Sequence, residues 1–330
     1  MQFGIRIPSI AWPGLTYERS ARLRDYVRKC EELGFDACWV IDHYLKTPLI
    51  YAVSWLDPLT SLAFVAGCTK TIKIGTAILV LPYRHPVLLA KEVATLDFLS
   101  GGRYVYGVGA GWDPTEYEVM GVRLSERGRR TEEVLEATRR LLTEGRVSYR
   151  GRFYTFEDVD FDPLPPRMPE VWVAGGGVTH APGTPESTVI QPSVLRRILA
   201  ADAWIVRSSG SGVEGIQEDY RIVRRFLKDN GRDPDTLKYA ATQFLHIVED
   251  ASRDKCLAVQ KEHFEVMMGT HRHLDDLMAS YLFGTLDDMH RRIDQYVKLG
   301  TQYLILNPIT DEMDQLDLIR KHIVDKYADR

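Results

Sequence analysis

The sequence predicts an α/β fold, a (β/α)8 TIM barrel with insertions, and three observations support that prediction. Eight apolar, strand-like runs alternate with segments of helical periodicity, which is the number of strand–helix units in such a barrel. The runs are nearly continuously apolar, as expected of parallel strands that are covered on both faces. With 330 residues and 45% hydrophobic composition the chain can bury a large core. We therefore expect a single domain spanning residues 1–330.

The expected strands lie, in chain order, at residues 2–8, 37–42, 72–79, 103–111, 170–177, 202–208, 239–248 and 302–308. The expected helices lie at 18–33, 58–68, 86–99, 127–144, 192–200, 213–229, 252–267, 286–299 and 312–327. Insertions are expected near residues 147–166, 178–192 and 269–285. The first alternates like a hairpin that turns at Arg150 and Gly151, and the second is a long polar loop. Such long loops usually bind ligands or act as lids.

The charge balance favours a small-molecule substrate. Lys and Arg number 42 against 46 Asp and Glu, a net charge of -4, so nothing draws the chain to nucleic acid or an anionic membrane. The first residues lack the pattern of a secretory signal, and no run reaches the roughly 18 apolar residues of a spanning helix. We expect a cytoplasmic protein with neither nucleic-acid nor membrane partners.

Glycines gather where the expected strands end, which is the edge that carries the chemistry of such barrels. Gly107, Gly109 and Gly111 end one strand, and Gly175, Gly176 and Gly177 end the next. Glycines at two neighbouring strand ends would let a ligand approach the backbone closely, which indicates a flat or anionic ligand. The alternative is steric, because glycine also makes room for a bulky neighbour. A dinucleotide fingerprint is a weak match, because Trp112 holds the place of its third glycine.

The segment after the sixth strand is the clearest phosphate candidate. Ser208, Ser209, Gly210 and Ser211 precede a helix expected from residue 213, so hydroxyls, free amides and the positive helix end could converge on one phosphate. A solvated turn with a serine N-cap is the alternative.

Asp42 and His43 follow the second strand and are the candidate acid–base residues. A salt-bridged structural histidine is the common alternative. A metal-dependent hydrolase would need a His-x-His after the first strand, which instead ends Ile-Arg-Ile-Pro-Ser, so we expect no metal. The G-x-S-x-G motif of serine hydrolases is also missing from the sequence.

The stretches GFDACWVIDHY, IKIGTAILVLPYRHPVLLAKEVATLDFLSGGRYVYGVGAGW, VWVAGGG, DAWIV and YLILNP resemble the bacterial luciferase-like family of flavin- and deazaflavin-dependent oxidoreductases. The resemblance extends from Gly4 to about Pro308. It implies a TIM barrel that binds FMN or coenzyme F420 in its mouth and assembles as a homodimer or larger homo-oligomer.

Residue by residue, the resemblance places Asp42 and His43 near the cofactor ring. We expect His43 to work at the ring and Asp42 mainly to hold His43 in place. It places Ala77 and Ile78 where many members have a non-prolyl cis peptide behind that ring. Gly175, Gly176 and residues 208–212 fall on the loops that hold the cofactor phosphate.

Two departures bear on the substrate. Deazaflavin-dependent sugar-phosphate dehydrogenases of the family have a glutamate where this chain has Trp112, and a lysine near Ser211. A sugar phosphate is therefore not expected. Trp112, with Trp12 and Trp55, would instead line an aromatic wall suited to an uncharged apolar or aromatic molecule.

The resemblance leaves three functions open. The first, which we expect by default, is a monooxygenase that uses reduced FMN, supplied by a separate reductase, and O2 on a small apolar or aromatic organic substrate. The alternative is an oxidoreductase that transfers hydride at C5 of coenzyme F420, supplied by an F420 reductase, with His43 as acid or base. The third is a barrel that binds flavin without catalysis, against which the presence of His43 argues.

Overall fold

A computed structural model describes residues 1–10, 14, 16–46, 51–177, 189–207, 212–270 and 273–328. The barrel strands are β1 (Gln2–Arg6), β2 (Ala37–Val40), β3 (Lys73–Thr76), β4 (Leu79–Val80), β5 (Tyr104–Gly109), β8 (Glu170–Ala174), β9 (Ala203–Ile205), β10 (Lys238–Leu245) and β11 (Tyr303–Pro308). The helices are α1 (Tyr17–Glu32), α2 (Pro58–Cys68), α3 (Pro86–Ser100), α4 (Pro114–Val119), α5 (Arg127–Glu144), α6 (Pro192–Leu199), α7 (Val213–Asp229), α8 (Arg253–Met268), α9 (Leu274–Ser280), α10 (Leu286–Leu299), α11 (Met313–Ile319) and α12 (Asp325–Tyr327).

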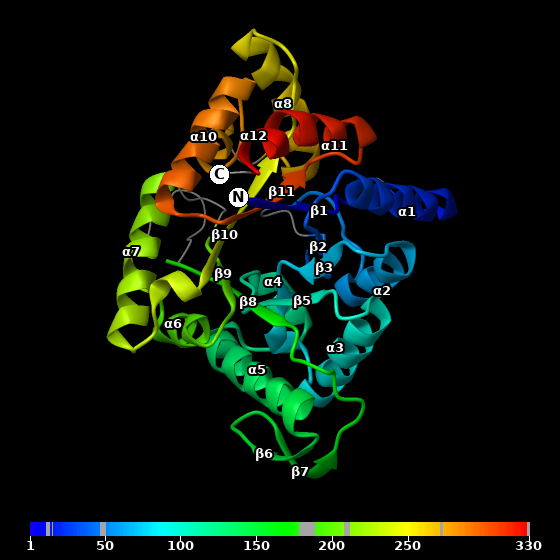
Figure 1. Cartoon of the computed structure of the whole chain (residues 1–330), viewed down its shortest axis with the longest axis vertical. Helices are drawn as coiled ribbons and strands as arrows, with labels where there is room; N and C mark the ends of the chain where they lie inside the picture. Colours follow the sequence, from blue (N-terminus) through cyan, green and yellow to red (C-terminus); the bar gives the residue numbers. More distant parts are fainter. Residues whose placement is uncertain are drawn as a thin grey trace.

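All the strand pairings in the barrel are parallel, and the sheet closes on itself. The hydrogen-bonded order is β3-β2-β1-β11-β10-β9-β8-β5-β4, and β3 also pairs with β5. Because β3 and β4 are two pieces of one strand, the sheet is an eight-stranded barrel. Figure 1 shows the strands at the centre and the helices around them. The predicted (β/α)8 barrel is confirmed.

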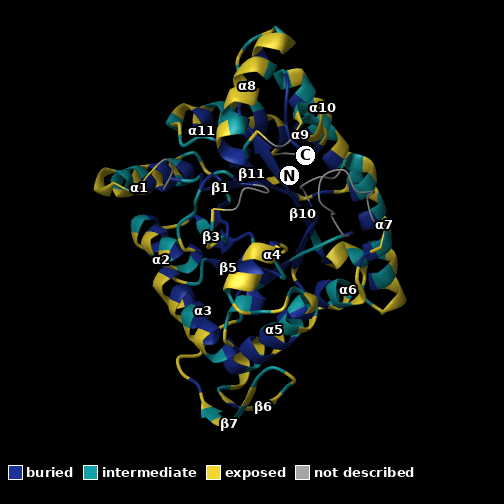
Figure 2. Ribbon diagram, turned by 180° about the vertical axis from the view of Figure 1, so that it is seen from behind, coloured by how far each residue is buried: buried dark blue, intermediate teal, exposed yellow. Residues whose placement is uncertain are grey.

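The strands are covered on both sides, as their continuous apolar runs predicted. Every residue of β2, β5 and β11 is buried, and Figure 2 shows buried strands inside helices whose outer faces are exposed. Inside the barrel, Trp39 packs against Trp172 with ring centroids 4.8 Å apart and donates from Nε1 to the hydroxyl of Tyr303 at 3.2 Å. These aromatic side chains fill the interior of the barrel beside β2, β8 and β11.

Local signals explain where several helices begin and end. Asp57 caps α2 by accepting from the amide of Thr60, and Pro58 occupies the first turn. Thr285 and Asp288 form a capping box at α10. Gly101 ends α3 in the left-handed conformation, with φ of 68°.

Of the three expected insertions, residues 147–166 contain the hairpin. It consists of β6 (Arg146–Arg150) and β7 (Thr155–Asp160), antiparallel and outside the barrel sheet. Residues 269–285 contain α9, a helix that the sequence did not predict. Of the expected insertion at residues 178–192, residues 178–188 lie outside the described residues.

Candidate functional site

The candidate residues that the structure describes lie where parallel strands end, on one face of the barrel. Asp42 and His43 follow β2, Ala77 and Ile78 separate β3 from β4, and Trp112 follows β5. Since the strands are parallel, their carboxyl ends meet at one mouth. The fold thus places these residues at the same end of the barrel.

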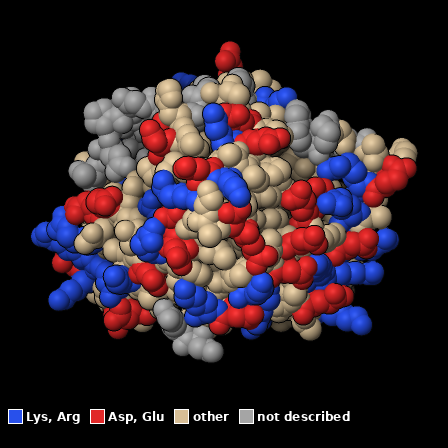
Figure 3. Space-filling view, turned by 90° about the horizontal axis from the view of Figure 1, so that it is seen from above, with Lys and Arg blue, Asp and Glu red and all other residues tan. Residues whose placement is uncertain are grey.

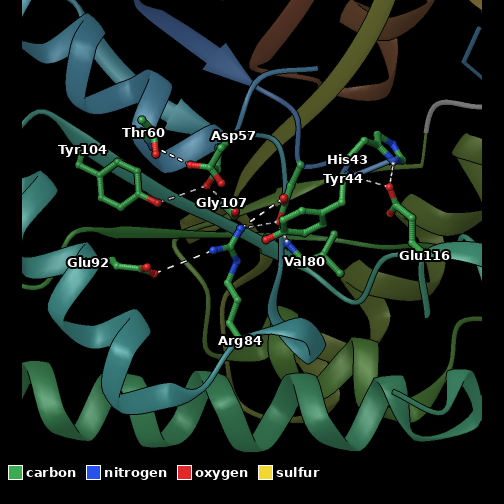
Figure 4. Close-up of polar contacts among 12 residues, drawn as sticks. His43, Tyr44, Asp57, Thr60, Val80, Arg84, Glu92, Tyr104, Gly107 and Glu116 are labelled. Atoms are coloured by element: carbon green, nitrogen blue, oxygen red, sulfur yellow. Dashed lines mark hydrogen bonds and ion pairs between the residues drawn. The ribbon is translucent and has the colours of Figure 1, made fainter. Parts of the chain in front are cut away.

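The ring of His43 contacts a carboxylate that the sequence analysis missed. Nδ1 of His43 lies 3.3 Å from Oε1 of Glu116, which comes from α4 (Figure 4). The same oxygen accepts hydrogen bonds from the amides of Tyr44 at 2.8 Å and Leu45 at 3.2 Å. Burial alone would raise the pKa of Glu116, but His43 and the two amides lower it below the usual glutamate value. Glu116 is therefore an ionised, buried anchor for the ring of His43.

A sequence signal for Glu116 exists. Asp113 caps α4 by accepting from the amides of Thr115 and Glu116, and Pro114 stands in its first turn. The pattern Asp-Pro-x-Glu after a strand predicts a short helix with an acidic first turn. The pairing with His43, 73 residues earlier, needs the fold.

Asp42 does not hold His43 in place as the sequence suggested. Its carboxylate pairs with Arg84 at 3.1 Å and accepts from the amide of Val80 at 2.8 Å. Arg84 also lies 3.9 Å from Glu92 (Figure 4). Burial raises the pKa of Asp42, while Arg84 and the Val80 amide oppose that shift. Neighbouring residues of an extended chain point to opposite sides, so Asp42 holds the end of β4 while the ring of His43 contacts Glu116.

Aromatic side chains surround His43. Its ring centroid lies 5.2 Å from that of Tyr51 and 6.1 Å from that of Trp112, and Tyr51 lies 5.7 Å from Trp55. Trp112 is 40% exposed, whereas Tyr51 is buried. The structure thus brings Trp112 to the histidine and Trp55 to Tyr51, a residue that the sequence analysis had not selected. Trp12 lies outside the described residues.

The neighbouring strand leaves no room for side chains at the glycines in and just after β5. A Cβ atom at Gly107 would come within 1.8 Å of the carbonyl oxygen of Thr76, and one at Gly109 within 2.6 Å of Cδ1 of Ile78. Gly111 has a φ of 68° and faces Val80. Contact of these glycines with a cofactor stays a prediction, because the crowding that excludes their side chains comes from β3, β4 and the link between them.

The peptide bond between Ala77 and Ile78 is cis, the geometry that the resemblance implied at this position. The carbonyl oxygen of Ala77 accepts from Nη2 of Arg6 at 2.9 Å. Arg6 is 5% exposed and was not among the predicted site residues.

The predicted phosphate loops are described only in part. The amide of Gly177 donates to Asp219 of α7 at 2.9 Å, and Asp219 pairs with Arg207 at 2.8 Å. The amide of Gly175 donates to the carbonyl of Ile205 at 3.2 Å, and a Cβ at Gly176 would come within 2.4 Å of the Asp219 carboxylate. Two of these glycine amides are thus engaged by the protein itself. Ser208, Ser209, Gly210 and Ser211 lie outside the described residues.

Among the described residues, no group of three or more His, Cys, Asp or Glu side chains is arranged to hold a metal ion. Within the same part of the chain, no helix is both long and apolar enough to cross a membrane. Charges of both signs are interspersed on the face shown in Figure 3.

The model of the luciferase-like monooxygenase family matches residues 1–182, more than half of the chain. The chain belongs to this family. Its barrel resembles the crystal structure of monooxygenase RslO1 from Streptomyces bottropensis, with a TM-score of 0.82 and 22% identity over 99% of this chain and 100% of that one.

Curated relatives with different activities match as well. The F420-dependent glucose-6-phosphate dehydrogenase of Amycolatopsis mediterranei is 32% identical over 58% of this chain, which spans 54% of that enzyme. The 5,10-methylenetetrahydromethanopterin reductase of Archaeoglobus fulgidus is 27% identical over 99% of both chains.

Proposed function

We propose that this protein is an oxidoreductase that transfers hydride between coenzyme F420 and a small organic substrate bound at the mouth of the barrel. The observation that carries the proposal is the buried contact between His43 and Glu116. The curated relative that matches over nearly the whole chain is named a reductase, and the Amycolatopsis relative is named as F420-dependent.

The residues at the mouth fit a flat redox ring. Buried polar atoms of Trp55 and Asn307 have no hydrogen-bond partner within the described protein, and the other lining is largely aromatic. A mainly apolar pocket with a few unmatched polar groups is typical of a cofactor site. Ala77 and Ile78 would lie against the ring. Ser208 to Ser211, with the N-terminus of α7, would hold the phosphate.

The chain's own contribution to the reaction is the placement and exchange of a proton. Coenzyme F420, when bound, supplies a two-electron donor or acceptor of hydride. With Nδ1 of His43 directed at Glu116, Nε2 is the nitrogen that can give a proton to, or take one from, a substrate oxygen. The negative charge of Glu116 stabilises the protonated ring and fixes its orientation. Tyr51 and Trp112 limit the access of water to that nitrogen.

A second candidate is the FMN-dependent monooxygenase that the sequence favoured, in which reduced FMN from a separate reductase supplies oxygenation with O2. The cluster of buried apolar side chains that includes Ile41, Tyr51, Phe244 and Tyr281 favours this candidate, because oxygenation needs a site that excludes water. The contact between His43 and Glu116 favours hydride transfer, because a positioned acid–base pair is what that reaction requires. In either case we expect a homodimer or larger homo-oligomer.

Titration of the protein with coenzyme F420 and with FMN tests the choice of cofactor. We expect F420 to bind at least a hundredfold more tightly, a difference of about 2.8 kcal/mol. The reverse preference would establish the monooxygenase candidate instead. His43→Gln should retain the cofactor and reduce turnover by a hundredfold or more, the usual scale for loss of an acid or base. Normal turnover across the whole pH range would contradict the role of His43.

A further inference from the structure

Arg6 is a buried cation inside the barrel. It is the last residue of β1, which lies between β2 and β11 in the sheet. Its Nη2 donates to the carbonyl of Ala77 at 2.9 Å and lies 3.4 Å from the hydroxyl of Thr242. The guanidinium is therefore held in place just below the mouth.

Arg6 differs from Arg84 and Arg207, two arginines that also lie near this end of the barrel. Arg84 pairs with Asp42 at 3.1 Å, and Arg207 pairs with Asp219 at 2.8 Å. In the described part of the chain no carboxylate lies within 4 Å of the Arg6 guanidinium, and its Nε has no hydrogen-bond partner. Burial lowers the pKa of Arg6, but a guanidinium remains charged in proteins. A buried charge without a counter-ion is costly, so its presence indicates an anion that comes from outside the chain.

The unpaired charge is connected to the proposed acid–base pair. Tyr51 is close enough to Arg6 to oppose the lowering of the arginine's pKa, and the ring of Tyr51 lies 5.2 Å from that of His43. On another side, the Arg6 guanidinium carbon lies 5.5 Å from the ring centroid of Phe244. The ring centroid of Tyr51 lies 6.0 Å from that of Phe244, so Arg6 and His43 border the same aromatic cluster.

Asn307 adds a second unmatched group beside Arg6. It lies on β11, the neighbour of β1, and its Nδ2 donates to the hydroxyl of Thr242 at 2.6 Å, while its Oδ1 has no partner. The Thr242 hydroxyl therefore has both Arg6 and Asn307 as donors, and its own hydrogen can be offered to a ligand. Donors from β1 and β10 can converge on one anionic oxygen.

We propose that Arg6 recognises a carboxylate on the substrate, so that the molecule acted on at His43 is an organic anion with an apolar or aromatic body. This inference rests on the proposed function and deepens it. It replaces the uncharged substrate expected from the sequence. A planar guanidinium pairs with a carboxylate through two parallel hydrogen bonds, which accounts for Nε being left without a partner inside the protein. The aromatic neighbours of Arg6 account for the apolar body.

Calorimetric binding of two matched probes, benzoate and the neutral benzamide, tests the proposal without turnover. Wild-type protein should bind benzoate at least tenfold more tightly than benzamide, and benzoate alone should raise the melting temperature. Arg6→Gln should lose this preference, and Arg6→Lys should keep part of it. Arg150→Gln, an equal change of charge on the exposed hairpin, should behave as wild type.

Three results would overturn the proposal. The first is equal affinity of the wild type for both probes, or no binding of benzoate. The second is an unchanged preference in Arg6→Gln. The third is a change confined to the cofactor, in which Arg6→Gln lowers the affinity for the reduced cofactor more than that for the oxidised cofactor and leaves benzoate binding intact. In that case the anion that Arg6 binds is the reduced cofactor ring. If Arg6→Gln does not fold, the wild type and Arg6→Lys still decide the question.

The outcome is separable from that of the proposed function. Loss of the benzoate preference together with normal turnover in His43→Gln would support the anion site and refute the acid–base role. If Arg6→Gln keeps the normal preference for benzoate and His43→Gln has impaired turnover, the acid–base role is supported and the anion site is refuted.

Discussion

Replacement of Glu116 by glutamine tests the central contact of the proposed site. The amide retains the shape of the side chain and can still accept from the amides of Tyr44 and Leu45, but it loses the negative charge. Charged hydrogen bonds contribute about 1.5–3 kcal/mol and neutral ones about 0.5–1.5 kcal/mol. With three donors at 2.8, 3.2 and 3.3 Å from one oxygen, we expect Glu116→Gln to lower the free energy of unfolding by about 2 kcal/mol at pH 7.

The pH dependence of that loss is a sharper test than its size. The pKa of Glu116 in the folded protein lies below its usual value, so the charge stabilises the fold above the unfolded pKa of about 4.3. The stabilisation is lost as the pH falls from there through the folded pKa. The difference between wild type and Glu116→Gln should therefore shrink below about pH 4.

Urea unfolding at pH 7 and in the acid range measures the loss of unfolding free energy and its pH dependence. Turnover of Glu116→Gln, measured in parallel, should fall at least tenfold because the protonated ring of His43 loses its counter-charge. Glu118→Gln, an exposed neighbour on α4, is the matched control and should match wild type in both assays. A loss in Glu116→Gln that is equal at both pH values, or absent at pH 7, would refute the reasoning.

Three further predictions concern other parts of the barrel. Burial, with a contribution from His263, lowers the pKa of His246 to about 4. The free energy of unfolding should therefore fall by about 3 kcal/mol at most as the pH drops from 6.5 to 4. His246→Phe should remove this pH dependence from acid unfolding curves. Gly107→Ala should destabilise the barrel by about 3 kcal/mol, because the added atom meets backbone of the neighbouring strand, whereas Gly67→Ala in α2 has open space and should be neutral or stabilising by thermal unfolding. Ser209→Ala should weaken binding of FMN by about 1.5–3 kcal/mol and leave riboflavin unchanged in calorimetry, if residues 208–211 hold the phosphate; equal losses would place the phosphate elsewhere.

Local patterns in the sequence were sufficient for the elements of the barrel. The predicted helices at 58–68, 127–144, 213–229 and 286–299 coincide with α2, α5, α7 and α10. Their periodicity and caps act within a few residues, so no tertiary information is needed to locate them. The alternation of strands and helices likewise indicated the mouth, because parallel strands must end at the same edge. Two helices, α4 and α9, were missed because six or seven residues carry too little periodicity.

The chemistry of the mouth depended on contacts between residues far apart in the chain. His43 and Asp42 are adjacent in sequence, yet one pairs with Glu116 and the other with Arg84. No local pattern links residues 73 or 42 positions apart, and the carboxylate next to the histidine in sequence was the natural but wrong partner.

Arg6 shows the same division between sequence and structure. In the sequence it is one charged residue in an apolar strand. Closure of the barrel buries Arg6 beside Ala77 and Thr242, with no carboxylate next to it. Only this burial, which the sequence does not show, led us to propose an anionic ligand. The sequence by itself therefore determined the barrel and the edge at which its parallel strands end, because propensity and periodicity are local. The tertiary structure decided which buried charges are paired within the described chain and which are not, because burial and pairing exist only once distant strands meet.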